Sequence, residues 1–412
     1  MHSAPQKPEP NGKIAEIRAT GSKRYAEADI VAACGLKVGD VVGREELQAA
    51  ANRLANLGPL SSVRYRFTSK GEDLAVEFQV EDAPTVPVWF DNFPWFTDGE
   101  LTEGIKHAVA LFDGTAPQQG AILDTMTDAL QQMLASRGVK ASVEHALIAA
   151  PGSEQMILSF SLAGANLTVS SVQFGDALAS ESPRLRDRVS DLVGKPYSRI
   201  ALALFASEQV QPVYLEKGYL RARIGPPSAR FTGSPTSTAP PNLVAYFPIE
   251  PGPVYHWAGI EWVGNPANKA TLDALVPLKP GDAADGVLIE GLWKRVEDEY
   301  GKYGYLDAKV TAQPLFDDAA KTISYRVVIA AGVAYHMADL VITGLSVPAE
   351  QKVREAWRIP RGQIFDSVYF DEFLATGLKQ AFGDYPVHYD KVGHLLRTHP
   401  ETATVDVLLD FQ

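Results

Sequence analysis

The sequence of 412 residues contains very little cysteine: one residue, Cys34, which lies among apolar neighbours. A single cysteine cannot form an internal disulfide, so the sequence indicates no redox compartment. The apolar neighbours favour a buried, unreactive thiol over a nucleophile. Long apolar runs are also missing, because no segment approaches the roughly 18–20 apolar residues that a membrane helix requires. The first residues, MHSAPQKPEPNGK, lack the apolar core of a signal peptide and are expected to form a polar tail, either native or left after removal of a signal.

Basic residues are in the minority. The 38 Lys and Arg residues face 50 Asp and Glu residues, which gives a net charge of −12. A nucleic acid or an anionic lipid surface requires a basic protein surface, so neither is expected as the main partner.

Signatures of catalysis and of cofactor binding are also absent. The sequence has no P-loop, no G-x-G-x-x-G and no nucleophile elbow. His388, His394 and His399 lack metal-ligand spacing with a cysteine. We therefore expect a non-enzymatic protein without metal, cofactor or small-molecule substrate.

The sequence does contain a repeated phrase. YLEKGYLRARI occupies residues 214–224 and YGKYGYLDAKV occupies residues 300–310. Weaker relatives lie at 54–65, 133–144 and 378–389. In each copy a glycine follows an amphipathic stretch and precedes a β-like run, which predicts a helix that ends at a glycine and is followed by a strand. These glycines are Gly58, Gly138, Gly218, Gly304 and Gly383.

A second series of glycines lies upstream of the first at nearly constant spacing. Its members are Gly39, Gly114, Gly194, Gly281 and Gly362. The intervening segment has a helical apolar period, as at Leu288, Leu292, Val296, Tyr300 and Tyr303, or at Leu47, Ala51, Leu54 and Leu57. A shorter helix and a short strand are expected before each upstream glycine.

Each repeat closes on alternating apolar residues, which predicts a half-buried strand. The alternating sets are Val76, Phe78 and Val80; Met156, Leu158, Phe160 and Leu162; Leu243, Ala245, Phe247 and Ile249; Ile323, Tyr325, Val327 and Ile329; and Val405, Val407, Leu409 and Phe411. The sequence thus predicts an α+β fold of tandem strand–helix–helix–strand–strand repeats. The expected boundaries are 12–83, 84–165, 166–253, 254–333 and 334–412, with a Pro- and Ser-rich insertion at 225–242.

The repeat resembles the POTRA (polypeptide-transport-associated) domain. The resemblance is closest in IAEIRATGSKRYAEADIVAACGLKVGDVVGREELQAAANRLANLGPLSSVRY, and it covers the chain from about residue 12 onwards. It implies a three-stranded mixed sheet with two helices on one face and the closing strand in the middle. Repeat two has FDNFPWFTDGEL in place of the glycine turn, and repeat five has GDYPVHY, which predicts a shifted or irregular second strand.

Arrays of this kind are similar to the periplasmic arm of the outer-membrane β-barrel assembly and secretion family. The resemblance implies a periplasmic protein associated with the outer membrane, either an excised arm or a relative without a barrel. Its expected partners are unfolded outer-membrane proteins and subunits of an assembly complex. Membrane proximity would come only through a barrel or partner that this chain lacks. The alternative is a passive spacer or hub that binds fixed partner subunits through helix faces and loops.

The resemblance also implies that the second strand of each unit lies at a sheet edge and binds extended client segments by strand addition. The residues that it assigns to this edge are Val63, Tyr65, Arg221, Ala222, Arg223, Ala308, Lys309 and Val310. A plainer interpretation remains open, in which the Gly-Tyr-Leu phrase only determines a turn. Five aromatic residues, Trp89, Phe90, Phe93, Trp95 and Phe96, form either a partner-contact patch or packing between repeats.

Overall fold

The computed structural model describes residues 11–165, 167–232, 242–264, 269–383 and 385–412. The chain divides into two compact units. Unit 1 comprises Met1–Val210 and Ile224–Glu250, and unit 2 comprises Gln211–Arg223 and Pro251–Gln412. Residues 233–241 of the predicted insertion lie outside the described part of the chain. None of the described helices is long and apolar enough to cross a membrane.

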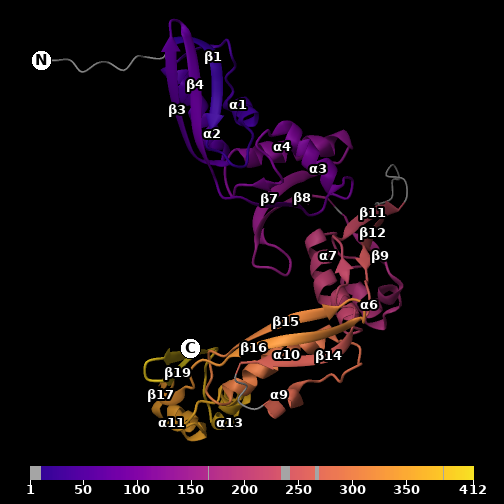
Figure 1. Ribbon diagram of the computed structural model, residues 1–412, viewed down its shortest axis with the longest axis vertical. Coiled ribbons are helices and arrows are strands. Elements are labelled where there is room, and N and C mark those ends of the chain that lie inside the picture. The colour runs from indigo at the N-terminus through magenta and orange to yellow at the C-terminus, as the bar shows by residue number, and fades with distance from the viewer. Residues whose placement is uncertain (1–10, 166, 233–241, 265–268, 384) are drawn as a thin grey trace, which may run out of the picture. The chain divides into compact units, whose positions relative to one another are not determined.

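Unit 1 begins with two sheets of the same design (Figure 1). The elements of the first are β1 (Asn11–Thr20), α1 (Glu27–Cys34), β2 (Val41–Gly43), α2 (Arg44–Leu57), β3 (Leu60–Lys70) and β4 (Asp73–Asp82). Those of the second are β5 (Val86–Phe90), α3 (Asp98–Ala108), β6 (Thr115–Ala116), α4 (Ile122–Ser136), β7 (Ser142–Ala149) and β8 (Met156–Ala163). The strand orders are β2-β1-β4-β3 and β6-β5-β8-β7, so the closing strands β4 and β8 are central.

The third sheet has the order β11-β12-β9, and β10 forms a separate short pair with β13. The strands are β9 (Val169–Phe174), β10 (Arg223–Ile224), β11 (Ser228–Thr232), β12 (Asn242–Phe247) and β13 (Ile249–Glu250). The helical segments are α5 (Ala177–Glu181), α6 (Pro183–Arg188), the 3-10 turn η1 (Val189–Asp191), α7 (Arg199–Phe205), the π-helical turn η2 (Ala206–Val210) and α8 (Gln211–Leu215).

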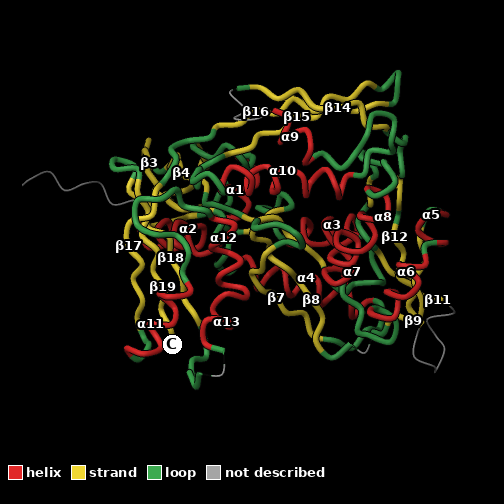
Figure 2. The backbone as a smooth tube through the Cα atoms, turned by 90° about the horizontal axis from the view of Figure 1, so that it is seen from below, coloured by secondary structure: helices red, strands yellow, loops and turns green. Residues whose placement is uncertain are grey.

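Unit 2 contains two further sheets, with orders β14-β16-β15 and β17-β19-β18. The first contains β14 (His256–Val263), α9 (Lys269–Leu275), α10 (Gly286–Gly301), β15 (Lys309–Asp317) and β16 (Thr322–Ala330). The second contains β17 (His336–Thr343), α11 (Val347–Ala356), α12 (Ser367–Glu372), the π-helical turn η3 (Phe373–Gly377), α13 (Leu378–Phe382), β18 (Val392–His399) and β19 (Thr404–Phe411). Figure 2 shows α9 and α10 on one side of the β14-β16-β15 sheet.

These observations confirm the predicted α+β class of small mixed sheets with helices, with two refinements. In the first two repeats β2 and β6 add a short fourth strand. In the third and fifth repeats the long helix is interrupted by the π-helical turns η2 and η3. All five helix-ending glycines have positive φ, which explains why glycine stands at each of these turns.

The hydrophobic alternation locates most of the core correctly. Phe78, Phe160 and Phe247 on the central strands are fully buried. Met156 is exposed, although it continues the alternation of β8. In α10 the inward stripe begins at Ile289, which is buried, instead of Leu288, which is exposed. Ile289 begins a stripe that continues through Leu292, Val296 and Tyr300 with the i, i+3, i+4 spacing of a helix face.

A candidate binding edge and the joints at its ends

The second strand of each repeat lies at an end of its sheet. These strands are β3, β7, β11, β15 and β18. Val63 and Tyr65 lie in β3, while Lys309 and Val310 begin β15. The side chains of Val63 and Tyr65 are half-buried against the core, and the Tyr65 ring lies 6.5 Å from that of Phe78. Any binding at these positions must therefore involve the backbone of the edge.

The prediction was wrong for three of the edge residues, because Arg221, Ala222 and Ala308 precede the strands and do not lie in them. The N–H of Ala222 donates to the carbonyl of Tyr219 over 3.0 Å, and that of Ala308 donates to the carbonyl of Tyr305 over 3.3 Å. These two amides close turns and do not point outward from a ladder.

Arg223 lies in β10, which pairs with β13 and is not part of the three-stranded sheet. The edge strand of the third repeat is instead β11, within the segment expected to be a solvated insertion. The residues between β10 and β11 are Gly225, Pro226 and Pro227. Two consecutive prolines without N–H groups interrupt a ladder, which explains why β10 does not continue into β11.

The first strands also lie near sheet edges, but their outer side is irregular and already occupied. In β14 the register slips between Trp257 and Gly259, and similar bulges occur in β1, β9 and β17. The N–H of Trp257 donates to Asp282 and its carbonyl accepts from Gly281, both over 2.8 Å. Bulges and covering loops discourage further strand pairing, so the second strand is the more accessible edge of the sheet.

Strand β15 is the longer of the two regular edge strands of unit 2, at 9 residues against 8 in β18. It pairs with β16 without interruption from Lys309 to Asp317. Pro314, opposite Tyr325, has no N–H, and proline is accepted on an edge strand where that position faces away from its neighbour. In an antiparallel pair, every second residue of the edge strand directs its N–H and C=O groups away from the neighbouring strand. Val310 and Ala312 lie four and two positions before Pro314, so their N–H and C=O groups also point away from β16. Their side chains are half-buried against the core, so burial alternates over the first part of the strand, whereas Pro314 is exposed.

Two joints with the same backbone bonds lie at the ends of the β14-β16-β15 repeat. We call the contact of Gly218–Leu220 with Tyr255–Trp257 the upstream joint. The contact of Gly304–Leu306 with Tyr335–Met337 is the downstream joint. The N–H of Tyr255 donates to Gly218 and the N–H of Tyr335 donates to Gly304, each over 2.8 Å. All four residues belong to unit 2.

The two joints also share their packing. Tyr255 and Tyr335 are almost completely buried, with Leu220 packed in the cluster of the first and Leu306 in the cluster of the second. Gly218 and Gly304 both have φ of 83°. A Cβ on Gly218 would lie 2.7 Å from the carbonyl oxygen of Tyr255, and one on Gly304 would lie 2.5 Å from that of Tyr335. Glycine is therefore required at these positions by conformation and by close approach.

The upstream joint contacts the far end of β15. The hydroxyl of Tyr255 donates to Asp318 over 2.5 Å, and Arg221 donates to the same carboxylate over 3.0 Å. The Tyr255 and Phe316 rings meet edge to face with centroids 4.8 Å apart, and the Arg221 guanidinium lies 4.2 Å from the Phe316 centroid. Arg221 aligns with Asp307 in the repeated phrase.

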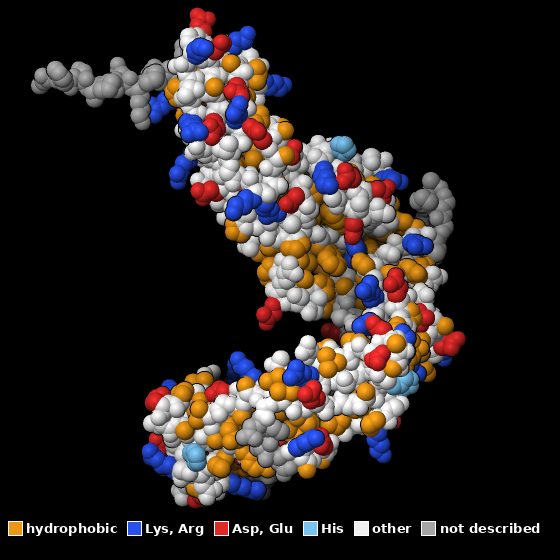
Figure 3. All heavy atoms as spheres, in the orientation of Figure 1, with side chains coloured by type: hydrophobic (Ala, Val, Ile, Leu, Met, Phe, Trp, Pro, Cys, Tyr) orange, Lys and Arg blue, Asp and Glu red, His pale blue; other side chains and the backbone are white. Residues whose placement is uncertain are grey.

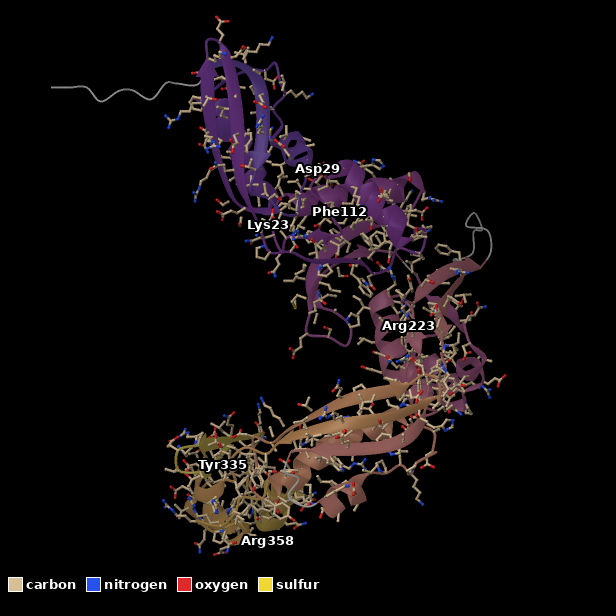
Figure 4. All side chains as sticks on the ribbon, viewed as in Figure 1. Lys23, Asp29, Phe112, Arg223, Tyr335 and Arg358 are labelled. Atoms are coloured by element: carbon tan, nitrogen blue, oxygen red, sulfur yellow. The ribbon has the colours of Figure 1, made fainter. Side chains whose placement is uncertain are left out.

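The downstream joint contacts the near end of β15. The hydroxyl of Tyr335, a residue labelled in Figure 4, donates to Asp307 over 2.7 Å. Asp307 precedes the first residue of β15 by two positions. The tyrosine is thus common to both joints, whereas its carboxylate partner comes from different segments: from the β15–β16 turn upstream and from the repeated phrase downstream.

These hydrogen bonds shift the ionisation of the groups involved. The bond to Asp318 raises the pKa of Tyr255, and burial contributes in the same direction. The bond to Asp307 likewise raises the pKa of Tyr335. Conversely, the hydroxyl of Tyr255 and then Arg221 lower the pKa of Asp318. Each shift favours the protonation state in which tyrosine donates and carboxylate accepts.

The aromatic segment of unit 1 packs within the second repeat and against the third. Phe90 and Phe93 are buried, and none of Trp89, Trp95 and Phe96 is fully exposed. Trp89 lies beside Arg199 (5.5 Å) and Trp95 lies beside Phe231 (5.4 Å), and both partners belong to the third repeat. Phe96 lies beside Arg137 (5.2 Å) within the second repeat. Beside them Asp91 accepts from Ser198 over 3.0 Å and from the N–H of Ile200 over 2.9 Å, which holds the start of α7. These contacts favour packing between repeats over an open partner patch.

Sequence reasoning missed the tyrosines of the joints. The signal was present as a second repeated phrase, because both residues are followed by histidine in PVYHW and VAYHM. In the described part of the chain, no group of three or more His, Cys, Asp or Glu residues could hold a metal ion.

Comparison with known families and proteins agrees with the fold. Residues 12–83 and 255–332 match the POTRA family model, described as "Surface antigen variable number repeat". A "Putative outer membrane protein assembly factor" of Treponema pallidum (strain Nichols) is 25% identical over 167 residues, which is 40% of this chain. The chain spans 20% of the length of that relative.

Two solved structures are also similar. The crystal structure of Haemophilus influenzae BamA POTRA3-5 is 20% identical, with a TM-score of 0.45, over 60% of this chain and 96% of the other. That of Haemophilus influenzae BamA POTRA4 is 30% identical, with a TM-score of 0.18, over 19% and 93% respectively. Residues 12–83 and 255–332 are therefore POTRA domains, so the chain contains at least two such domains.

Proposed function

We propose that this chain is a non-enzymatic scaffold for the assembly of outer-membrane proteins. It lies in the periplasm beside the outer membrane and holds extended segments of unfolded clients by strand addition. The POTRA domains and the name of the Treponema relative support the general role. The observation that supports the binding mode is a difference between the two edges of the β14-β16-β15 sheet: β14 is bulged and is hydrogen-bonded on its outer side to Gly281 and Asp282, whereas β15 pairs with β16 without interruption at the other end of the sheet.

Strand addition suits a scaffold that accepts many clients, because it reads the backbone and not particular side chains. Each added hydrogen bond contributes roughly 0.5–1.5 kcal/mol net. Ordering each client residue costs about 1–2 kcal/mol. The two terms nearly cancel at one edge, so a client is held weakly and exchanges. Several edges in one chain, β3, β7, β11, β15 and β18, then increase the overall affinity through avidity.

The direct test removes one outward donor from β15. Ala312→Pro should weaken the binding of a ten-residue peptide that alternates Val or Tyr with Thr or Lys. The reason is that proline eliminates the N–H while the ladder to β16 remains. Ala312→Val adds similar bulk and keeps the donor, so it is the matched control. Binding is measured by fluorescence anisotropy of the labelled peptide, and folding by thermal melting.

A folded Ala312→Pro protein that binds the peptide as well as Ala312→Val does would exclude β15 as the binding edge. The same logic applies to the peptide. N-methylation of alternate amides should abolish binding when the methylated face meets β15, and it should have little effect on the opposite face.

A hub that binds a fixed partner is the second candidate, and one observation favours it. Figure 3 shows hydrophobic side chains gathered over the outer part of the β7–β8 hairpin. Leu147 and Met156 in these strands are more than a third exposed. Leu147→Ser with Met156→Ser would abolish the capture of a folded partner while peptide binding at β15 remains, if the hub is correct.

A further inference from the structure

We propose that β15 is a shared element of the two joints, so that a peptide bound along its edge and the closure of both joints stabilise each other. The inference rests on the proposed strand addition at β15, and it adds a mode of regulation to that site. Binding of a peptide at the edge of β15 would therefore stabilise the hydrogen bonds of Tyr255 and Tyr335, which the peptide does not contact.

The first ground is that both ends of β15 are held by residues from outside the β15–β16 hairpin. At its far end, Arg221 and Tyr255 converge on Asp318 and on the ring of Phe316. At its near end, the hydroxyl of Tyr335 holds Asp307. Displacement of the strand therefore disturbs hydrogen bonds in the upstream and the downstream joint together.

The second ground is that the same tyrosines make the backbone bonds of the joints. The N–H groups of Tyr255 and Tyr335 donate to Gly218 and Gly304, and their carbonyls accept from Ala284 and Phe365. Both tyrosine rings are almost completely buried, which restricts rotation about χ1 and χ2, so a displacement of the hydroxyl is transmitted to these backbone bonds.

A contrast with β3 shows that this arrangement is not common to every edge. The hairpin after β3 turns at Gly71, where an added Cβ would meet no atom within 4 Å. The hairpin after β15 turns at Asp318, which two other segments contact. A peptide on β3 would therefore lack this coupling at the turn.

The physical effect is a shared ordering cost. An edge strand that is held at both ends has already lost part of its conformational freedom, so less conformational entropy is lost when a peptide pairs with it. Coupling of this kind is reciprocal: the peptide must stabilise the joints by the same factor as the joints stabilise the bound peptide.

The experiment uses the full chain and places a photocrosslinking group on the edge. In Gln313→benzoylphenylalanine the exposed side chain of β15 captures the ten-residue alternating peptide, and the yield against concentration gives an apparent affinity for this edge. Hydrogen exchange of the segments that contain Tyr255 and Tyr335 is measured with and without peptide.

Bound peptide should slow the exchange of both segments. Tyr255→Phe and Tyr335→Phe should each weaken crosslinking about fivefold, within the range of ordinary coupling. Tyr303→Phe, at an exposed position on the turn after α10, should leave it unchanged. Asp307→Asn tests the downstream joint independently if Tyr335→Phe does not fold.

The outcomes separate the two proposals. If every variant crosslinks the peptide with the same apparent affinity, and bound peptide does not slow hydrogen exchange at Tyr255 and Tyr335, the coupling is overturned while strand addition at β15 stands. No crosslinking at Gln313 would overturn strand addition at β15, and the coupling with it. Protection of both segments together with weaker crosslinking in both tyrosine variants would support the inference.

Discussion

The upstream and downstream joints of unit 2 make equivalent backbone hydrogen bonds, and each buries one tyrosine, Tyr255 or Tyr335. The hydroxyl groups of the two tyrosines donate to different acceptors. Upstream, the acceptor Asp318 is also paired with Arg221. Downstream, the acceptor Asp307 occupies the position in the repeated phrase that Arg221 has upstream. The comparison shows that the shape of the joint depends on glycine and tyrosine, whereas the charges around the hydroxyl can be rearranged.

The largest effect should come from the glycines that both joints share. Gly304→Ala and Gly218→Ala place a Cβ against a backbone carbonyl at positive φ, so each should lower the free energy of unfolding by about 2–4 kcal/mol. The measurement is urea denaturation of the full chain.

Two alanine substitutions separate clash from strain. Gly281 has positive φ but open space around its Cβ, so Gly281→Ala should cost only about 1–2 kcal/mol. Gly291 lies in α10 with no neighbouring atoms, so Gly291→Ala should stabilise the protein by roughly 0.5–1 kcal/mol. Equal losses at Gly304 and Gly281 would show that close approach to Tyr335 contributes nothing.

The charge difference between the joints can be inverted. Arg221→Asp brings a second carboxylate beside Asp318, so it should destabilise unit 2, and more strongly at low salt because the site is exposed. Arg221→Asp with Asp318→Ser should restore most of the stability, since it gives the upstream joint the chemistry of the downstream one. Thermal melting at two salt concentrations measures both. A double variant as unstable as the single one would contradict the equivalence of the joints.

Removal of a tyrosine hydroxyl should lower the free energy of unfolding by different amounts in the two joints. Tyr335→Phe should cost about 1 kcal/mol, as for a typical hydrogen bond. Tyr255→Phe should cost less, because Asp318 keeps its bond to Arg221. The difference is read from paired denaturation curves, and the reverse order would show that Arg221 does not compensate.

The smallest effect is the response to pH. Tyr255 and Tyr335 have raised pKa values in the folded chain, so their contribution to stability is complete below the unfolded pKa of about 10 and is lost as the pH rises through the folded value. Asp318 has a lowered pKa, so its contribution is present above about 3.8 and is lost as the pH falls through the folded value. Melting temperatures across both ranges should show an acid loss that is smaller in Asp318→Asn, because other carboxylates with lowered pKa values remain, and an alkaline loss that is smaller in Tyr335→Phe.

Much of the fold could be predicted because its determinants are local. A glycine with positive φ lies within three residues after the last helix of each repeat, and alternation marks each central strand, as at Phe78, Val327 and Val407. The second strand of the third repeat was misplaced because its position depends on where two prolines interrupt pairing, which is a property of the ladder and not of hydrophobic period. The shift of β18 away from Gly383 was expected from GDYPVHY and is confirmed by its start at Val392.

The sequence by itself determined the repeat, the class of fold and the glycine turns, since each follows from conformational preference and periodicity over a few residues. Only the tertiary structure decided what the Gly-Tyr-Leu phrase does. The phrase closes a turn and receives the tyrosine of the following repeat, and the edge strand begins after it. Tyr255 and Asp318 are hydrogen-bonded although they lie 63 residues apart in the sequence. A contact over that separation depends on how whole sheets pack, which no local pattern specifies.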